Sequence, residues 1–505
     1  MRPADAFLLA TLVAATLAWP LAAPPIAFHG EAREGLVVQD VVRHGRWVLP
    51  LRNGELPSKP PLYHWIAAAA AHVAGLSDAI VRLPSALGAL VIVLATAALG
   101  MAAGCGRAGA AAGGAGGLAG GRAVGWLAAG VLLGTHDFVQ LASRARVDMV
   151  FSAAVTVGLI AFFRWYRTGD RGARAACYAA AACSVLAKGP VGVILLGLVI
   201  GAFLARERRL DRWRALWSWP LAAAVVVVDV GWYAAAAAAG GAAFLELQLL
   251  QENVQRFAGR GVFGLHGGRG RLMLAGDMML DLLPWTLVLP WAAVRWWRGE
   301  REDTAGRFLH TWWLVILAFF TLAYGKRSAY LLPLCPALAL LAARALAGAL
   351  AARPGAPGLP VPAARLAWLR PARVQVAVAV ALVAGGMTLG IQLARYRDVR
   401  RESLLSLVPA VRRAVPPEAV LEAAPTLAVS DRQVLAYRLA RAIPWATDAA
   451  TAEPRYRLLP AEGLRPAERM RLVAVSDRRG PDVALVRILP PARDLATAPG
   501  ARLVR

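Results

Sequence analysis

The sequence predicts a polytopic, all-helical membrane protein with a small soluble domain at its C-terminal end. Of its 505 residues, 58% are hydrophobic, and the mean hydropathy is +0.52. Soluble domains are closer to half apolar and lack repeated stretches long enough to cross a bilayer. Here such stretches recur from residue 5 to about residue 395, whereas the rest is more charged and richer in proline. We therefore expect a membrane domain over residues 1–395 and a C-terminal domain over 396–505.

The apolar runs indicate where the spans lie. The first run, residues 5–23, predicts an uncleaved first span because so many spans follow it. A cleaved signal peptide is the alternative, since Leu21-Ala22-Ala23 suits a peptidase. In all we expect about 11–13 transmembrane helices. The further runs lie near residues 84–104, 108–138, 148–165, 175–187, 189–205, 215–238, 274–295, 307–323, 329–350 and 374–395.

The positive charge fits this topology. The formal net charge is +25, but most arginines lie in short loops between apolar runs, as the positive-inside rule predicts for cytoplasmic loops. No basic patch interleaved with aromatic residues indicates a nucleic-acid partner. With the arginine-rich loops on the cytoplasmic side, the remaining polar segments share the opposite face. These segments are 24–83, 139–147, 239–273, 324–328 and the C-terminal tail.

The tail itself predicts a small α/β or α+β domain. Strand-like runs occupy residues 472–475 and 483–489, and helical stretches lie near 401–414 and 431–441. Nothing in these segments indicates chemistry.

Segment 24–83 is too long and too patterned for a plain loop, and we expect it to carry interfacial helices. Its motifs are Gly30-Glu31-Ala32-Arg33-Glu34, Asn53-Gly54-Glu55, Ser58-Lys59-Pro60-Pro61-Leu62-Tyr63-His64-Trp65 and Arg82-Leu83-Pro84.

More motifs follow along the chain, on the same predicted face. They are Ala145-Arg146-Val147-Asp148-Met149, Lys188-Gly189-Pro190, Trp232-Tyr233 with Glu252-Asn253 and Arg256-Phe257, Leu283-Pro284-Trp285, and the run from Gly325 to Pro333. As an ordered group, these motifs resemble those of the bacterial GT-C glycosyltransferases related to protein O-mannosyltransferases and to the aminoarabinose transferase of lipid A. The resemblance covers roughly residues 5–350.

The resemblance implies a GT-C fold and an inverting glycosyltransferase. Such an enzyme moves a sugar from a polyprenyl-phosphate donor to a lipid or protein acceptor at the periplasmic face of the inner membrane. The donor phosphate is a good leaving group, so the chemistry needs a carboxylate to take the acceptor proton and cations to hold the phosphate. The active site and the C-terminal domain would then be periplasmic.

By this resemblance, Glu31 is the expected base. The family motif most often begins with Asp followed by Glu, and here Gly30 replaces the Asp. Either Glu31 inherits the role or the acidic contribution shifts to Glu34 or Asp148. The alternative for Glu31 is a solvated loop carboxylate. For Asp148 it is a helix N-terminal charge, worth about 0.3–1 kcal/mol, or a self-satisfied ion cluster with Arg144 and Arg146.

The lysines mark the expected phosphate site. Lysine and arginine together number 56, and only three are lysines. All three fall in the motifs, which suggests that a compact ammonium group is needed there. Snorkelling of lysine to the interface is the alternative. The expected phosphate ligands are Lys59, Arg82, Lys188, Lys326, Arg327 and Tyr330.

We expect the sugar or the acceptor beside Tyr63, His64, Arg146, Glu252 and Arg256. Aromatic belts at the membrane interface also explain Tyr63, and a lone interfacial histidine such as His64 is more often structural than basic. No histidine has metal-ligand spacing. Some GT-C relatives use a divalent cation and others do not, so metal use stays open.

Two other classes of protein remain as alternatives. A transporter or flippase would also have many spans, and the short runs 175–187 and 189–205 around Lys188-Gly189-Pro190 are typical of interrupted helices. However, the charges gather at one face rather than at mid-membrane, and no internal repeat is visible. A non-catalytic scaffold for envelope assembly is the other, because Gly30 departs from the motif. The identities of the sugar and of the acceptor stay open.

Overall fold

The computed structural model describes residues 1–22, 25–103, 116–260, 273–282, 285–287, 303–324, 327–351, 404–446, 455–462, 470–476 and 482–488, with a few single residues between 290 and 393. The chain forms two compact units. Unit 1 comprises Met1–Pro25, Asp40–Leu51 and Leu56–Ala394, and unit 2 comprises Ile26–Gln39, Arg52–Glu55 and Arg395–Arg505. Two pieces of segment 24–83 thus belong with the C-terminal part of the chain.

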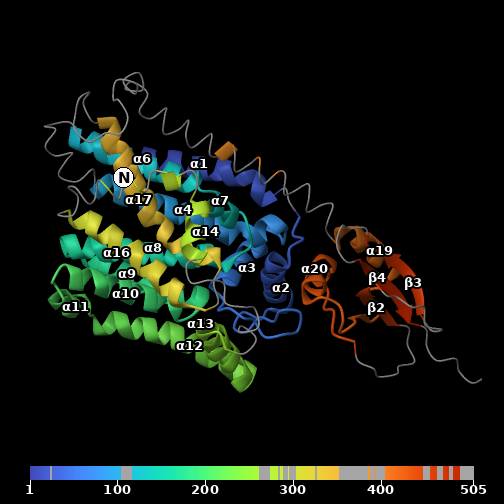
Figure 1. Cartoon of the computed structure of the whole chain (residues 1–505). Coiled ribbons are helices and arrows are strands. Elements are labelled where there is room, and N and C mark those ends of the chain that lie inside the picture. Colours follow the sequence, from blue (N-terminus) through green and yellow to red (C-terminus); the bar gives the residue numbers. More distant parts are fainter. Residues whose placement is uncertain are drawn as a thin grey trace, which may run out of the picture. The chain divides into compact units, whose positions relative to one another are not determined.

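Unit 1 is helical throughout its described elements (Figure 1). Helix α2 (His29–His44) begins in unit 2 and ends in unit 1. The other elements are α1 (Pro3–Ala22), α3 (Leu62–Ala74), α4 (Asp78–Ala103), α6 (Gly116–Leu133), α7 (His136–Ala142), α8 (Val147–Thr168), α9 (Arg171–Lys188), α10 (Val191–Arg206), α11 (Asp211–Leu216), α12 (Trp219–Leu245), η1 (Glu246–Gln255), α13 (Arg256–Ala258), α14 (Met273–Asp281), η3 (Trp285–Leu287), α16 (Thr304–Leu322), η5 (Ser328–Leu334) and α17 (Cys335–Ala351).

The chain is a multi-pass membrane protein. Within the described residues, five helical stretches are long and apolar enough to cross a bilayer, and three shorter apolar helices accompany them. The five are Asp78–Ala102, Val147–Thr168, Trp219–Ala258, Thr304–Leu322 and Ser328–Gly348. The expected run near 374–395 lies largely outside the described residues, and part of the run near 274–295 lies outside them as well. The total number of spans therefore stays a prediction.

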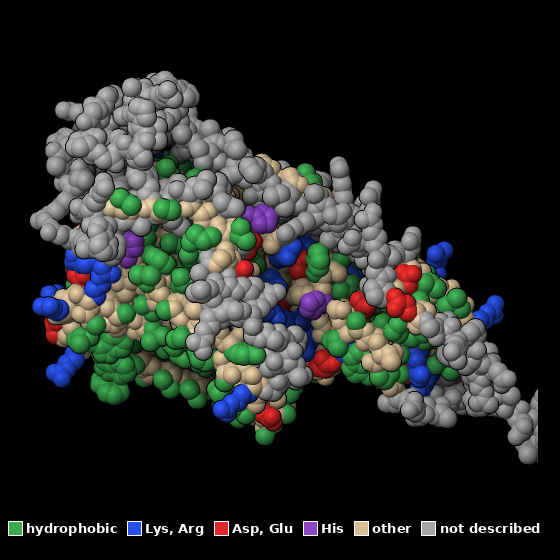
Figure 2. Space-filling model, viewed as in Figure 1, with side chains coloured by type: hydrophobic (Ala, Val, Ile, Leu, Met, Phe, Trp, Pro, Cys, Tyr) green, Lys and Arg blue, Asp and Glu red, His purple; other side chains and the backbone are tan. Residues whose placement is uncertain are grey.

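Burial separates central spans from peripheral ones. Of the apolar window in α8, 83% is buried inside the protein, against 17% of the window in α12. The outward side of α12 carries Val226, Val227, Val228 and Val230, and Figure 2 shows hydrophobic surface over α10 and α12. A continuous aliphatic surface of this kind suits contact with lipid chains.

Small residues allow the central helices to approach closely. A Cβ atom at Gly88 of α4 would lie 3.0 Å from the backbone oxygen of Met149 on α8. A Cβ at Gly100 would lie 3.0 Å from the Cα atom of Gly125 on α6. Such contacts between backbones are the usual basis of helix packing in membranes. They fix α8, and with it Asp148, against α4.

Unit 2 contains a four-stranded sheet in the order β1-β2-β4-β3. Strand β1 (Leu421–Ala423) pairs in parallel with β2 (Arg455–Pro460), whereas β4 (Val483–Ile488) pairs antiparallel with both β2 and β3 (Met470–Val475). The helical elements of this domain are η7 (Leu404–Ser406), α19 (Leu407–Ala414) and α20 (Val429–Leu439). The expected fold class, a helical membrane protein with a small α/β or α+β domain, is confirmed.

We predict that Gly88→Ala destabilises unit 1 by about 1–3 kcal/mol, because the added methyl group meets the backbone of α8 and forces the helices apart. Thermal unfolding in detergent would measure the effect. Gly197→Ala on α10 is the matched control, since no atom lies within 4 Å of a Cβ there. Equal melting temperatures for the two variants would contradict the close packing.

Candidate active site

The first centre of charge in unit 1 is formed around Asp148, in the first turn of α8. Its Oδ1 atom lies 2.6 Å from Nζ of Lys188, and its Oδ2 atom lies 3.3 Å from Nε of Arg146. The side chains of Asp148 and Lys188 are only 7% and 11% exposed. Both carboxylate oxygens are therefore engaged by cations inside the protein.

The Lys188-Gly189-Pro190 turn explains the position of this lysine. Helix α9 ends at Lys188, and Gly189 follows with φ +91°, a conformation that favours glycine. Pro190 then begins α10, where a fixed φ and a missing N–H are tolerated. The break between the two helices was predicted from the sequence. It leaves the ammonium group of Lys188 at the end of α9.

The second centre is formed around Glu252 on η1. Its Oε2 atom accepts from Lys59 at 2.6 Å and from Arg256 at 2.8 Å. Lys59 and Glu252 are 193 residues apart in the chain. A single carboxylate oxygen thus holds two cations in a largely buried place, with side chains 11–19% exposed.

Tyr330 on η5 connects the two centres. Its ring lies 4.6 Å from Nζ of Lys188, and its hydroxyl oxygen accepts from Nη1 of Arg256 at 3.4 Å. The ring of Phe151 lies on another side of the same ammonium group, at 4.9 Å. We call Lys59, Arg146, Asp148, Lys188, Glu252, Arg256 and Tyr330 the charged cluster.

Helix η1 reaches Lys59 because the chain bends at Gly241, which has φ +67° inside the run that begins as α12. The ten residues of η1 have π-helical hydrogen bonding, which is frequent at functional sites. Gln248 donates to the carbonyl of Pro57 at 2.6 Å, two residues before Lys59. The π-helix is therefore attached to the lysine segment at two successive turns, by Gln248 and by Glu252.

An apolar cluster supports this region. Trp232 and Phe244 of α12 pack with Leu49 and Leu186, and the Trp232 indole donates to the carbonyl of Val48 at 3.0 Å. The outer segment is thus held against α9 and α12 in the part that carries Lys59.

Burial lowers the pKa of Lys59 from its ordinary value, and Arg256 beside it acts in the same direction. Glu252 opposes both by stabilising the charged ammonium. An anion next to Lys59, whether Glu252 or a ligand, therefore favours its charged form against the effects of burial and Arg256.

Several predicted residues have their described contacts elsewhere. Tyr63 is fully buried and donates to the carbonyl of Val81 at 2.6 Å, and Arg82 donates to the carbonyl of Leu21 at 3.1 Å. His64 is buried beside Tyr63. These contacts join α3, α4 and α1. The phosphate-binding role expected of Arg82 and the sugar or acceptor contact expected of Tyr63 and His64 stay predictions.

The predicted acids Glu31 and Glu34 lie on the part of α2 that belongs to unit 2, and both are buried. Glu34 is paired with Arg33 at 2.7 Å. Arg327 is described and exposed, whereas Lys326 lies outside the described residues. The catalytic role of Glu31 and Glu34 and the phosphate-binding role of Lys326 and Arg327 stay predictions.

One residue that contacts the charged cluster was not predicted from the sequence. Phe151 lies three residues after Asp148, on the same face of α8, and its ring contacts Lys188. The spacing of three residues from Asp148 was the sequence feature that could have indicated Phe151. A phenylalanine inside a span is ordinarily a packing residue, however, so it was not selected.

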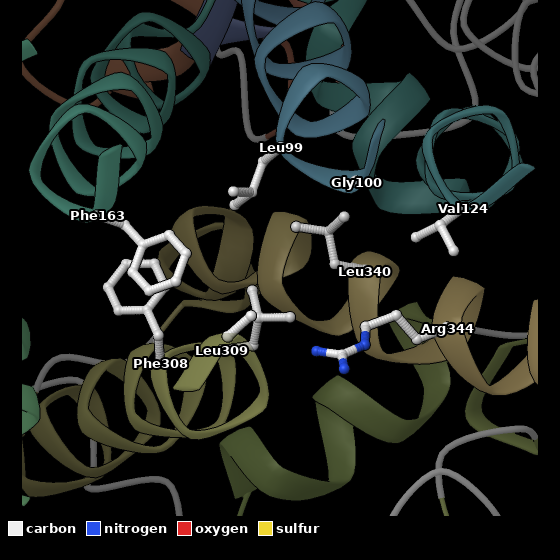
Figure 3. Close-up of a pocket in the computed structure, with 9 residues that line it drawn as sticks. Leu99, Gly100, Val124, Phe163, Phe308, Leu309, Leu340 and Arg344 are labelled. Carbon is white, nitrogen blue, oxygen red and sulfur yellow. The ribbon is translucent and has the colours of Figure 1, made fainter. Parts of the chain in front are cut away.

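A separate cavity of about 10 Å³ lies between α4, α6, α8, α16 and α17 (Figure 3). Leu99, Leu309 and Leu340 line it, and Arg344 reaches it while pairing with Asp303. This volume holds about one water molecule, which is too little for a sugar. Among the described residues, no group of three or more His, Cys, Asp and Glu side chains has the arrangement of a metal site.

No protein-family model matches the chain. Curated relatives are undecaprenyl phosphate-α-4-amino-4-deoxy-L-arabinose arabinosyl transferases. The chain is 26% identical to that of Shewanella sediminis over 325 residues, 63% of this chain and 55% of the relative. It is 28% identical to transferase 1 of Pseudomonas fluorescens over 331 residues, 63% and 54% of the two chains. The chain thus matches little more than half the length of these relatives.

Among solved structures, the chain is similar to ArnT from Cupriavidus metallidurans. The TM-score is 0.76 with ArnT bound to undecaprenyl phosphate, at 19% identity, covering 96% of this chain and 98% of that one. The apo state gives the same TM-score over 95% and 97% of the two chains. The resemblance to GT-C glycosyltransferases is confirmed, and the chain has the GT-C fold.

We predict that Asp148→Asn destabilises the protein by about 3–5 kcal/mol, because it leaves Lys188 charged and without its counterion in a buried place. Adding Lys188→Met should recover much of that loss, since the more deeply buried of the two cations is then gone and Arg146, 24% exposed, can be hydrated. Thermal unfolding of the two single variants and the double variant would give the coupling energy. Additive losses would contradict a mutually dependent pair.

Proposed function

We propose that this chain is an inverting glycosyltransferase that moves a sugar from a polyprenyl-phosphate donor to a hydroxyl group of a lipid or protein acceptor. The observation that carries the proposal is the charged cluster. Its cations Lys59, Lys188, Arg146 and Arg256 number four and its carboxylates Asp148 and Glu252 number two. The excess of two positive charges suits a phosphate group. The relatives named for undecaprenyl-phosphate sugar donors support the same class of substrate.

The charge balance also favours the reaction over simple donor binding. A sugar phosphodiester carries one negative charge, and the polyprenyl phosphate released from it carries up to two. Cations fixed in a buried site stabilise the developing second charge without reorganising. Because this gain appears only as the bond breaks, it lowers the barrier and not merely the KM.

We infer that Glu252 holds the phosphate position until the donor arrives. Lys59 and Arg256 would exchange its carboxylate for phosphate oxygens, with the Tyr330 hydroxyl as a further donor of a hydrogen bond. Asp148 then keeps Lys188 charged and in place, because both its oxygens are engaged by cations. In this proposal Asp148 positions Lys188 and does not act as the base.

In the proposed reaction the acceptor oxygen forms a bond to the anomeric carbon from the side opposite the phosphate. The bond from that carbon to the phosphate oxygen breaks, and its electron pair leaves with the phosphate. The acceptor proton passes to a carboxylate, for which Glu31 is the first candidate and Glu34 the second. One displacement inverts the anomeric centre, in contrast to the two-step retaining route.

We further propose that the protein resides in the bacterial inner membrane, with the charged cluster and the C-terminal domain in the periplasm. The distribution of arginine supports this orientation. Neither the curated relatives nor the similar solved structures favour a transporter, a flippase or a scaffold.

We predict that Glu31→Gln lowers transfer by about 10²–10⁴-fold, the usual contribution of a general base. Mass spectrometry of envelope lipids and exported proteins would show a species lighter by one sugar, and would identify both sugar and acceptor. Glu418→Gln, an exposed carboxylate of the C-terminal domain, is the matched control. A variant that transfers at the normal rate would exclude Glu31 as the base.

We also predict that Glu252→Gln shifts the alkaline limit of donor binding to lower pH. Without the carboxylate, burial and Arg256 lower the pKa of Lys59 further, so its ammonium group is lost at a lower pH. Binding of a polyprenyl phosphate measured against pH would test this. Glu246→Gln, exposed on the same helix, should leave the profile unchanged. Coincident profiles for all three proteins would show that Glu252 does not tune Lys59.

A further inference from the structure

The acid-bearing part of α2 packs inside unit 2, against α20 of the C-terminal domain. At Gly35, a Cβ atom would lie 2.4 Å from Cε2 of Tyr437, closer than real side chains approach. The ring of Tyr437 therefore lies directly against the backbone of α2, and only glycine permits that contact.

A second contact continues along the same helix. The side-chain amide of Gln39 donates to the carbonyl of Tyr437 at 3.1 Å. Positions 31, 35 and 39 are four residues apart, so they lie along one side of α2. Glu31 is 4% exposed and lies one turn before Gly35. One residue of the C-terminal domain thus contacts α2 at the two turns that follow the proposed base.

A second part of the first outer segment is held in the same way. Asn53 and Gly54 form a tight turn with φ +53° and +83°, typical of a two-residue hairpin. The Asn53 side chain donates to the carbonyl of Ile443 at 3.2 Å and accepts from its N–H at 2.9 Å. The motif Asn53-Gly54-Glu55 therefore serves contact with the C-terminal domain.

Arg432 completes this attachment. Its guanidinium group pairs with Glu55, donates to the carbonyl of Ile443 at 3.2 Å and lies 4.1 Å from the ring of Trp445. The Arg432 side chain is only 2% exposed. A buried arginine with three such contacts is costly to disturb, so the hairpin is firmly fixed to the domain.

We propose that the C-terminal domain is the positioning element for the acid-bearing turn of α2, through the backbone carbonyl of Tyr437, which holds Gln39, and through Arg432, which holds Glu55. The domain holds the outer segment on both sides of residues 40–51, by α2 before them and by the hairpin after them. This role rests on the proposed function, because it matters for catalysis only if Glu31 is the base.

The test is a set of full-length variants in detergent, assayed with a polyprenyl-phosphate sugar. Gly35→Ala should lower kcat by roughly 10²-fold, because a shift of about 1 Å at a reacting group has that effect. The KM for the donor should stay within about twofold, since the phosphate ligands are untouched. Gly35→Ala with Tyr437→Ala should recover most of kcat, because the smaller side chain gives room for the methyl group. Gly197→Ala is the control for a glycine replacement in a helix.

Hydrogen exchange of amides 31–39 gives an independent readout. Protection should fall in Gly35→Ala and return in the double variant. A double variant with neither restored kcat nor restored protection would overturn the proposal, as would an unchanged kcat in Gly35→Ala. If the wild-type protein transfers no sugar, the proposed function fails. The exchange data alone then decide whether the domain fixes α2.

Discussion

The pairing of buried charges is the constraint on which the membrane unit depends. A charged group removed from water is costly unless an opposite charge and hydrogen bonds replace its hydration. Lys188 reaches the end of α9 inside the protein, and Asp148 in the first turn of α8 is the group that compensates it. The close approach of α4 to α8 at Gly88 fixes the helix that carries Asp148. The turn at Gly189 ends the helix that carries Lys188, and the ring of Tyr330 lies 4.6 Å from the Lys188 ammonium group.

The charged cluster also suits the reversible binding of an anionic ligand. Asp148 binds its two cations through different oxygens, whereas Glu252 holds Lys59 and Arg256 through one oxygen. The first arrangement is a stable framework. The second is a place where an anion with several oxygens can replace a single carboxylate oxygen, on a π-helix that begins just after a bend at Gly241.

Lys59, Lys188 and Tyr330, which the sequence predicts as phosphate ligands, lie in the charged cluster, whereas Lys326 lies outside the described residues. The lysines stand out because the chain is so rich in arginine. Sequence reasoning also found the break at Lys188-Gly189-Pro190, since glycine and proline have local conformational consequences. It could not find the partner of Lys59, because Glu252 is 193 residues away and only the fold brings them together. Nor could it predict that Arg82 and Tyr63 donate to backbone carbonyls, since such partners leave no trace in the sequence. The contact of Gly35 with Tyr437 could not be predicted either, because the two residues are far apart in the sequence and meet only in the folded chain.

The central claim is that the cations around Glu252 bind the donor phosphate. The most direct measurement is a cryo-electron microscopy structure of the full chain with a polyprenyl phosphate. Our account predicts phosphate oxygens within hydrogen-bond distance of Lys59 and Arg256, with the carboxylate of Glu252 displaced from both. A phosphate bound elsewhere, with the Lys59–Glu252 pair intact, would contradict it.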